Sequence, residues 1–378
     1  MKQYSLFIHL MLSVLLLSAC GGRSKTSSAS ITEEAIPLRY AENLSLSATE
    51  DYTIARLRNP WDTTRILHTY VLVDKEKPLP ADLPEGTLVR TPLSKAVVYS
   101  SVHCGLLNQI GALKSIGGVC DLKYIKLQEV QDGCRTGSIT DVGDGMNPDI
   151  EKMIDLHPDA IMLSPFENSG GYGRVEKLNI PIIECADYME TSALGRAEWT
   201  RFYGLLFGRT QQADSLFAEV EKNYQELKAL VAPLSSAPSV ISELKNGSAW
   251  YVPGGKSTSA QLYADAGANY VFAADEHSGS VPLAFETVFD KGQNADFWLI
   301  KYNQAIDKTY KELKQDYAPY AGFRAYKERK IYGCNTNKVS LYEDYPFHPD
   351  WLLKDLIKIF HPTLLEGYEL KYFTKLAE

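Results

Sequence analysis

The 378-residue sequence lacks the short motifs by which several enzyme classes are identified. It contains no Gly-x-Ser-x-Gly nucleophile elbow and no His-Glu-x-x-His zinc motif. Gly254-Gly255-Lys256-Ser257 is similar to the end of a phosphate-binding loop, but Trp250 stands where that loop requires its first glycine. These absences argue against hydrolase, zinc-peptidase and nucleotidase chemistry, so binding is favoured over catalysis.

Cysteine and histidine are both scarce, with six and seven residues respectively. There is no Cys-x-x-Cys pair and the histidines are scattered, so no zinc signature is present. We expect the cysteines beyond Cys20 to be small buried residues, with room for one disulfide whose pairing the sequence leaves open. They are Cys104, Cys120, Cys134, Cys185 and Cys334.

Positively charged residues are also fewer than negatively charged ones. The sequence has 39 lysines and arginines and 47 acidic residues, which give a net charge of -8. This balance argues against nucleic acid as a partner and against a polyanion held by bulk electrostatics. After Leu17 no apolar stretch is long enough to cross a bilayer. With 45% hydrophobic residues the chain can still build the cores of two domains.

The first twenty residues have the layout of a secretory signal segment. Lys2 precedes an apolar run from Leu10 to Leu17, and Leu17-Ser18-Ala19-Cys20 closes it. This resembles a bacterial lipobox, in which cleavage precedes Cys20 and Cys20 is lipidated. We therefore expect a signal peptide at 1–19 and a lipidated tether at 20–35. The mature protein would lie on the periplasmic side of the cell envelope, held to the membrane by its lipid anchor alone.

Beyond the tether the pattern predicts an α/β protein. Residues 36–94 read as a β-rich N-terminal extension. Short apolar runs alternate with helical patterns over 95–198 and again over 233–378, as in βαβ units. Residues 199–232 form an interlobe helical segment with one apolar face, in which Thr210–Val231 would measure about 33 Å. The expected fold is two Rossmann-like lobes joined by a single long helix, with the β-rich extension N-terminal to the first lobe.

Individual elements are predicted within these two lobes. Leu156–Met162 and Asn294–Ile300 are similar segments, and each follows a helix that carries a glutamate, Glu151 or Glu286. This similarity between the two segments favours two lobes with the same arrangement of strands and helices. Strands are expected at Val97–Tyr99, Ala160–Leu163, Ile180–Ile183, Val240–Leu244, Phe297–Ile300 and Ile331–Tyr332, and helices at Cys104–Leu113 and Ser259–Ala266.

Four stretches then resemble a known family: Ser100 to His103, Gly143 to Pro148, Ile150 to Ile161, and Phe347 to Leu356. They are similar to the helical-backbone periplasmic binding proteins of ABC importers, the branch that captures iron–siderophores, haem and vitamin B12. The resemblance runs from about Lys95 to Thr363. It implies an ABC permease as partner, an iron–siderophore, haem or cobalamin as ligand, and no covalent chemistry or resident cofactor.

The resemblance also implies roles for particular residues. Glu151 and Glu286, one on each lobe, map to the glutamates that dock against permease arginines, where charge-assisted pairs would fix orientation. Ligands of this fold class bind at the carboxyl ends of the strands, so the following loops supply the candidates. These are Ser100, Ser101, His103, Phe166, Tyr172 and Tyr188 in the first lobe, and Trp250, Tyr251, Lys256, His277, Tyr302 and Asn335 in the second.

Three alternatives remain open at this point. One is a Zn- or Mn-binding protein of the related branch, although only His103 and His277 lie in candidate loops. Either histidine is an alternative axial ligand for haem iron. The others are an extracytoplasmic chelate-modifying enzyme and an adhesion module. We expect a monomer without a resident metal, and the sequence does not choose between siderophore, haem and cobalamin.

Overall fold

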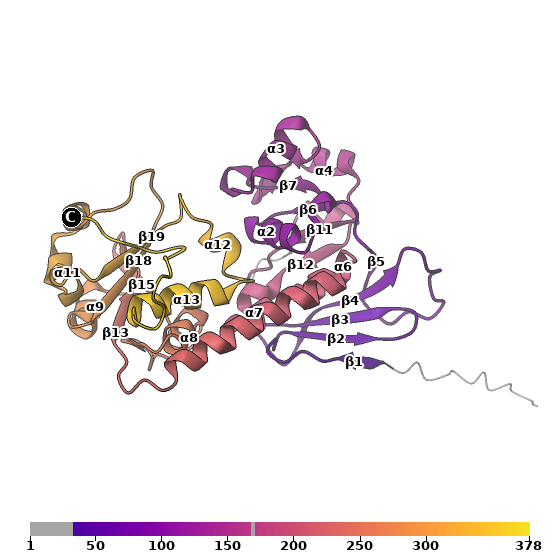
Figure 1. The fold of residues 1–378 in the computed structure, drawn as a ribbon. Coiled ribbons are helices and arrows are strands. Elements are labelled where there is room, and N and C mark those ends of the chain that lie inside the picture. Colours follow the sequence, from indigo (N-terminus) through magenta and orange to yellow (C-terminus); the bar gives the residue numbers. More distant parts are fainter. Residues whose placement is uncertain (1–32, 168–170) are drawn as a thin grey trace, which may run out of the picture. The chain divides into compact units, whose positions relative to one another are not determined.

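The computed structural model describes residues 33–167 and 171–378 (Figure 1). The predicted signal peptide, Cys20 and most of the tether lie outside the described residues. Among the residues that are described, no helix has the length and apolar character needed to span a membrane. Residues Glu34–Glu378 form one compact unit.

The N-terminal part of this unit is a five-stranded sheet in the order β1-β2-β3-β4-β5. Neighbouring strands are antiparallel except β4 and β5, which are parallel. Leu46, Leu57 and Leu72 pack from one face of this sheet into the core of the next sheet. The strands are β1 (Glu34–Ile36), β2 (Leu44–Ala48), β3 (Thr53–Arg58), β4 (Ile66–Asp74) and β5 (Thr87–Thr91).

The first parallel sheet has the order β12-β11-β6-β7-β8. All residues of β6, β7 and β11 are buried, as expected for parallel strands covered on both faces. The strands are β6 (Ala96–Val98), β7 (Ile116–Val119), β8 (Thr140–Asp141), β11 (Ala160–Leu163) and β12 (Ile182–Glu184). Around them lie the hairpin β9 (Gly143–Asp144) and β10 (Asn147–Pro148), and the helices α2 (Ser101–Gln109), α3 (Gln128–Thr136) and α4 (Ile150–Leu156).

The second sheet has the order β16-β13-β18-β19-β20, and all its pairs are parallel except β19 with β20. Its strands are β13 (Ser239–Ser242), β16 (Asn269–Tyr270), β18 (Phe297–Tyr302), β19 (Ile331–Asn335) and β20 (Thr374–Lys375). A small antiparallel sheet joins β14 (Lys245–Asn246), β15 (Ala249–Pro253) and β17 (Ser280–Leu283). The helices of this part are α8 (Thr258–Asp265), α9 (Phe285–Gly292), α10 (Tyr310–Asp316), α11 (Arg324–Lys327), α12 (Leu341–Asp344) and α13 (Pro349–Phe360).

Three helices occupy the chain between the two sheets: α5 (Ala193–Glu198), α6 (Thr200–Leu206) and α7 (Thr210–Val231). The bounds of α7 are those that the helical period predicts. Its buried face carries Phe217, Val220 and Tyr224, at the spacing of one helical stripe. In Figure 1, α7 is the long helix that packs against α6 along one stretch and against α13 along another.

The two similar sequence segments have the same local structure. Asp159 precedes β11, and its Oδ2 accepts hydrogen bonds from the backbone N and Oγ of Ser94, at 2.6 and 2.7 Å. Asp296 precedes β18, and its Oδ2 accepts the same pair from Ser239, at 2.8 and 2.7 Å. Burial opposes ionisation, but these serine hydrogen bonds lower the pKa of both carboxyls. Each aspartate thus ties a central strand to its neighbour, which explains why the segment recurs. The α/β class predicted from the sequence is confirmed.

Some element bounds differ from the predicted ones. The helix predicted at Cys104–Leu113 is α2, Ser101–Gln109. It begins earlier because the Oγ of Ser100 caps it by accepting from the backbone N of Val102, at 3.2 Å. It ends earlier because Gly111 adopts φ +73°, which turns the chain out of the helix.

The five described cysteines are all free, and only Cys134 among them is not fully buried. Burial raises the pKa of the thiols of Cys104, Cys120 and Cys334 to about 12, so these residues are uncharged. The prediction of small buried residues is confirmed for four of them, and no disulfide joins any of the five.

Candidate functional site

Two cavities lie at the carboxyl ends of the parallel strands. The first has a volume of about 620 Å³, and we call it the charged cavity. From the first sheet it is lined by Ser101, Lys123, Tyr124 and Lys126, and from the second by Glu243, Lys301, Tyr302, Asn303, Thr336, Asn337, Tyr342 and Glu343. Loops from both sheets therefore contribute to one site, as expected for this class of fold.

The second cavity has a volume of about 500 Å³ and belongs to the first sheet alone. We call it the apolar cavity, because hydrophobic side chains such as Met146, Leu163, Phe166 and Val175 form much of its wall. Phe166 is 51% exposed and Met146 is 84% exposed. The predicted residues Ser100 and Tyr172 also line it.

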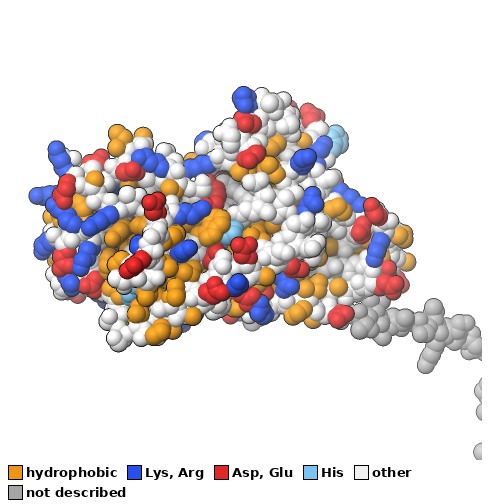
Figure 2. Space-filling view, viewed as in Figure 1, with side chains coloured by type: hydrophobic (Ala, Val, Ile, Leu, Met, Phe, Trp, Pro, Cys, Tyr) orange, Lys and Arg blue, Asp and Glu red, His pale blue; other side chains and the backbone are white. Residues whose placement is uncertain are grey.

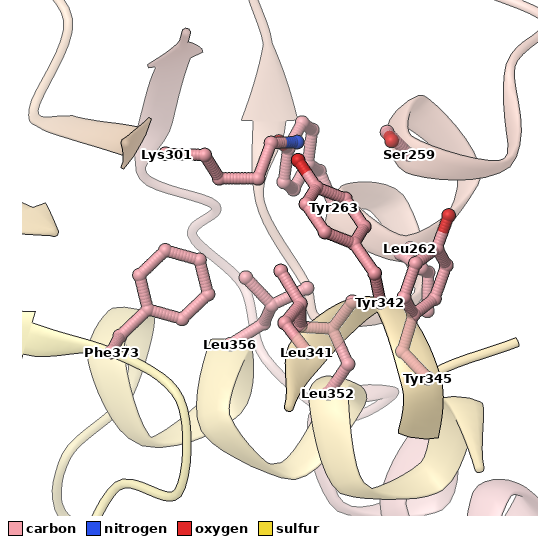
Figure 3. A pocket seen from close by; sticks show the side chains of 10 residues that line it. All are labelled: Ser259, Leu262, Tyr263, Lys301, Leu341, Tyr342, Tyr345, Leu352, Leu356 and Phe373. Carbon is pink, nitrogen blue, oxygen red and sulfur yellow. The ribbon is translucent and has the colours of Figure 1, made fainter. Parts of the chain in front are cut away.

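Lys301 and Glu243 form an ion pair at the strand ends of the second sheet. Burial opposes the positive charge of Lys301, but the Glu243 carboxylate raises the pKa of Lys301 well above its ordinary value. The ammonium therefore stays charged. Glu243 directly follows β13 and has φ +67°, a backbone conformation that costs energy for any residue except glycine. Figure 3 shows the end of the Lys301 side chain beside Tyr263, and both residues line a small pocket of about 40 Å³.

Lys126 and Lys123 approach the charged cavity from the first sheet. The Nζ of Lys126 donates to two carbonyl oxygens of the second sheet's loops, those of Thr336 and Val339, the latter at 3.2 Å. The Nζ of Lys123 lies 4.9 Å from the ring centroid of Tyr124, a cation–π geometry. In Figure 2, lysine and arginine side chains are interspersed with acidic ones over the visible face.

Helix α12 brings Tyr342 and Glu343 into the charged cavity, because it packs against α2. The approach is close, since a Cβ on Gly105 would meet the Glu343 carbonyl oxygen at 3.3 Å. Burial raises the pKa of the Glu343 carboxyl, although Lys126 acts in the opposite direction. The spacing of these two helices therefore sets how far the walls of the cavity stand apart.

A buried charged network links α2, α5 and α6. Asp187 accepts from the Nε2 of His103 at 2.9 Å, from the hydroxyl of Tyr203 at 2.8 Å and from the Nε of Arg196 at 3.0 Å. Burial opposes its charge, but His103 lowers the pKa of Asp187 to about 2. Burial likewise opposes protonation of His103, but Cys185 and Asp187 raise its pKa to about 10. Both groups are therefore ionised at neutral pH.

The structure brings five of the twelve predicted ligand residues into the two cavities. Ser101 and Tyr302 line the charged cavity, and Ser100, Phe166 and Tyr172 line the apolar one. The side chain of Tyr172 is fixed, because its hydroxyl donates to Glu184 at 2.7 Å.

The prediction that Trp250 lines the crevice is wrong. Its side chain is 0% exposed, and its Nε1 donates to the carbonyl oxygen of Ser242 at 3.0 Å. It packs against Trp298, with ring centroids 5.5 Å apart. The reason is strand alternation: β15 directs Trp250 into the core and its neighbour Tyr251, 49% exposed, outward.

His103 and Asn335 also lie in the interior, so the prediction that they line the site is wrong. His103 is 4% exposed and its Nε2 is bonded within the Asp187 network. The Nδ2 of Asn335 donates to Gln304 O and to Asp307 Oδ1, both at 2.9 Å. His103 thus joins α2 to the Asp187 network, and Asn335 orders the loop that carries Gln304 and Asp307.

Four further candidates are outside the walls of both cavities. The hydroxyl of Tyr188 donates to the Pro165 carbonyl oxygen at 2.6 Å. The remaining three are Tyr251 on β15, Lys256 paired with Glu276, and His277 beside Asp275. Among the described residues no group of three or more His, Cys, Asp or Glu is placed to hold a metal ion.

Sequence reasoning missed most of the charged wall. Glu243 and Lys301 stand at strand ends, where the general rule for this fold puts ligands, but the prediction took residues further along the loops. Lys123, Lys126 and Glu343 carry no local signal, because their loops face the cavity only through contacts between distant parts of the chain.

Glu151 and Glu286 occupy matched positions. Each lies exposed in the first turn of a helix, α4 or α9, and each helix precedes a central strand. Their carboxylates are therefore accessible to a partner.

Comparison with known proteins shows which family this architecture resembles. The sequence profile of the family described as periplasmic binding protein matches residues 96–337. An uncharacterised lipoprotein of Methanocaldococcus jannaschii is 24% identical over 366 residues, which cover 89% of this chain and 85% of the relative.

Solved structures agree with this fold. A periplasmic haem-binding protein from Pseudomonas aeruginosa superposes with a TM-score of 0.60 at 13% identity, over 76% of this chain and 99% of that one. A periplasmic vitamin B12-binding protein from Vibrio cholerae gives 0.53 at 12% identity, over 71% and 96%. With its α/β fold, its cavities at the strand ends and the profile match over residues 96–337, the protein belongs to the periplasmic binding protein family.

Proposed function

We propose that this chain is the substrate-binding lipoprotein of an ABC importer, and that it captures a metal chelate whose negatively charged groups bind in the charged cavity. The observation that carries the proposal is the convergence of three lysines, Lys123, Lys126 and Lys301, on one cavity lined by both sheets. The chelate would be an iron–siderophore, a haem or a corrinoid, and no covalent chemistry is involved.

The chemistry of the wall supports an anionic ligand. Of the three lysines, Lys301 is paired with a carboxylate, whereas Lys126 donates to neutral carbonyl oxygens. A ligand carboxylate, catecholate or phosphate would therefore gain charge-assisted hydrogen bonds without displacing an existing ion pair of Lys126. Three tyrosines, Tyr124, Tyr302 and Tyr342, add flat faces with polar tips.

The size of the cavity supports a chelate over a bare ion. Pockets for small organic ligands measure roughly 300–1,000 Å³, and the charged cavity is about 620 Å³. A naked Zn²⁺ or Mn²⁺ would need several histidines and carboxylates in direct contact with it.

We further propose how the captured chelate is delivered. The two sheets act as two lobes on the single long helix α7, which keeps closure on the ligand small. Glu151 and Glu286 dock against basic residues of the permease, one from each lobe. Lipidation of Cys20 holds the protein at the membrane where the permease resides.

The test is a titration of the full chain, purified from membranes in detergent. The probes are a ferric triscatecholate, a ferric trihydroxamate, haem and cyanocobalamin, with Zn²⁺ and Mn²⁺ alone as further arms. Lys123→Gln with Lys126→Gln should weaken binding of the preferred chelate by at least about tenfold, because two charge-assisted contacts are lost.

Lys222→Gln is the matched control, since Lys222 lies exposed on α7 and, among the residues that the structure describes, forms an ion pair with Glu226 alone. It should leave the affinity unchanged. Binding of a bare metal ion in preference to every chelate, or equal affinity of the double variant and the wild type, would overturn the proposal.

A further inference from the structure

We infer that the chelate carries an apolar arm beside its anionic metal-binding head, and that this arm occupies the apolar cavity. The inference rests on the proposed function of the charged cavity and names a narrower class of ligand for the same cleft. It requires that the two cavities adjoin, that their walls differ in chemistry and that the apolar one is open to a ligand.

At two places in the chain, neighbouring residues line the two cavities. Ser100 lines the apolar cavity, and the next residue, Ser101, lines the charged one. After β7, Asp121 lines the apolar cavity, and Lys123, two residues later, lines the charged one. Two separate loops therefore supply residues to both cavities, and a ligand that spans the Ser100–Ser101 step would occupy both.

The walls of the two cavities select different chemistry. The charged cavity has three lysines, whereas the apolar cavity has Ile150, Leu163, Phe166 and Val175 in its wall. A compact polyanion would fill the first and leave the second empty. An acyl chain or an aromatic ring would gain free energy in the second by removing its surface from water.

The apolar cavity is open, and it exposes side chains that proteins ordinarily bury. Phe166 is 51% exposed and Met146 is 84% exposed, on opposite strand-end loops of the same cavity. Exposed apolar surface of this kind, rimmed by polar residues, is typical of a binding site. Methionine suits an apolar arm of variable shape, because its side chain is flexible and polarisable.

The wall of the apolar cavity also contains one positively charged residue, Arg174. Arg174 is exposed at its wall, and no hydrogen bond or ion pair joins it to any other described residue. Its guanidinium is available to a carboxylate or carbonyl on the arm. The arm that fits best is therefore apolar along its length, with a polar group at the end.

The experiment uses the full chain in detergent and a matched pair of probes. One probe is a ferric triscatecholate with short side chains, and the other is the same triscatecholate extended by an eight-carbon acyl arm. We expect the extended chelate to bind about tenfold more tightly or better, because methylene burial outweighs the cost of ordering the chain.

Phe166→Ala with Met146→Ala should remove that gain and change the affinity for the short chelate by less than about twofold. Both side chains are exposed, so the fold should be retained, and a circular dichroism melt checks this. Leu79→Ala is the matched control, because Leu79 is 51% exposed in the N-terminal sheet region, away from both cavities. It should leave both affinities unchanged.

Equal wild-type affinity for the two chelates, or an equal loss of both in the double variant, would overturn this inference and leave the proposed function standing. Failure of both chelates and of every other chelate probe to bind would overturn the proposed function itself.

Discussion

The buried His103–Asp187 pair predicts a specific loss of stability as pH rises. The folded-state pKa of His103 is about 10, against an ordinary value of 6.5. Since the folded pKa is the higher one, the stabilisation is complete below about pH 6.5 and is lost progressively as pH rises toward 10. His103 is only 4% exposed, so solvent screening does not reduce this contribution greatly.

The magnitude follows from the linkage relation, in which each pH unit between the two pKa values changes the free energy of unfolding by about 1.4 kcal/mol. Between pH 6.5 and pH 9 the loss is therefore about 3 kcal/mol for this one group. Asp187, Arg196 and Tyr203 keep their protonation states in that window, and the remaining neighbour is the thiol of Cys185, which also raises the pKa of His103. Asp187 has a pKa of about 2, and the pKa values of Arg196 and Tyr203 are raised above their ordinary values.

The assay is urea unfolding of residues 36–378, the part of the chain after the predicted tether, at pH 6, 7, 8 and 9. Circular dichroism monitors the unfolding. His103→Gln keeps a donor for Asp187 but cannot titrate, so its profile should be flatter than the wild-type profile by about 3 kcal/mol across the range. Asp187→Asn should lower the free energy of unfolding by about 3–5 kcal/mol at neutral pH, because it leaves two cations buried without their anion. Parallel wild-type and His103→Gln profiles would show that protonation of His103 does not stabilise the fold.

Three other outcomes are expected. Glu151→Ala with Glu286→Ala should leave ligand affinity nearly unchanged and abolish uptake in cells, because both carboxylates are exposed outside the cavities; lost binding in the folded double variant would contradict the docking role. Cys20→Ala should release the protein from membranes into the soluble fraction, and a variant that still sediments as the acylated form would disprove the lipobox assignment. Trp250→Ala should cost about 3–5 kcal/mol of folding free energy by urea unfolding, because the side chain is fully buried, whereas Tyr251→Ala should cost less than about 1 kcal/mol. Equal effects of these two neighbours would show that the burial pattern along β15 is wrong.

The sequence alone determined the features that depend on neighbours along the chain. The helical period set both ends of α7, and the apolar run Ala160–Leu163 set both ends of β11. The repeated segments Leu156–Met162 and Asn294–Ile300 indicated two similar units by their residue pattern alone, although the fold was needed to bring to each aspartate the serine that binds it, 65 or 57 positions away. Patterns of this kind survive without knowledge of the fold, since their energies come from contacts within one element or its immediate partner.

Tertiary structure decided which side chains face the ligand. Trp250 and Tyr251 are adjacent, and only the pairing of β15 with β14 and β17 settles which of them points into the core. Lys126 and Lys301 are 175 positions apart in the numbering, and they meet in one cavity because two separate sheets direct their strand ends toward it. No periodicity in the chain encodes that meeting, because the packing that produces it acts between residues distant in sequence.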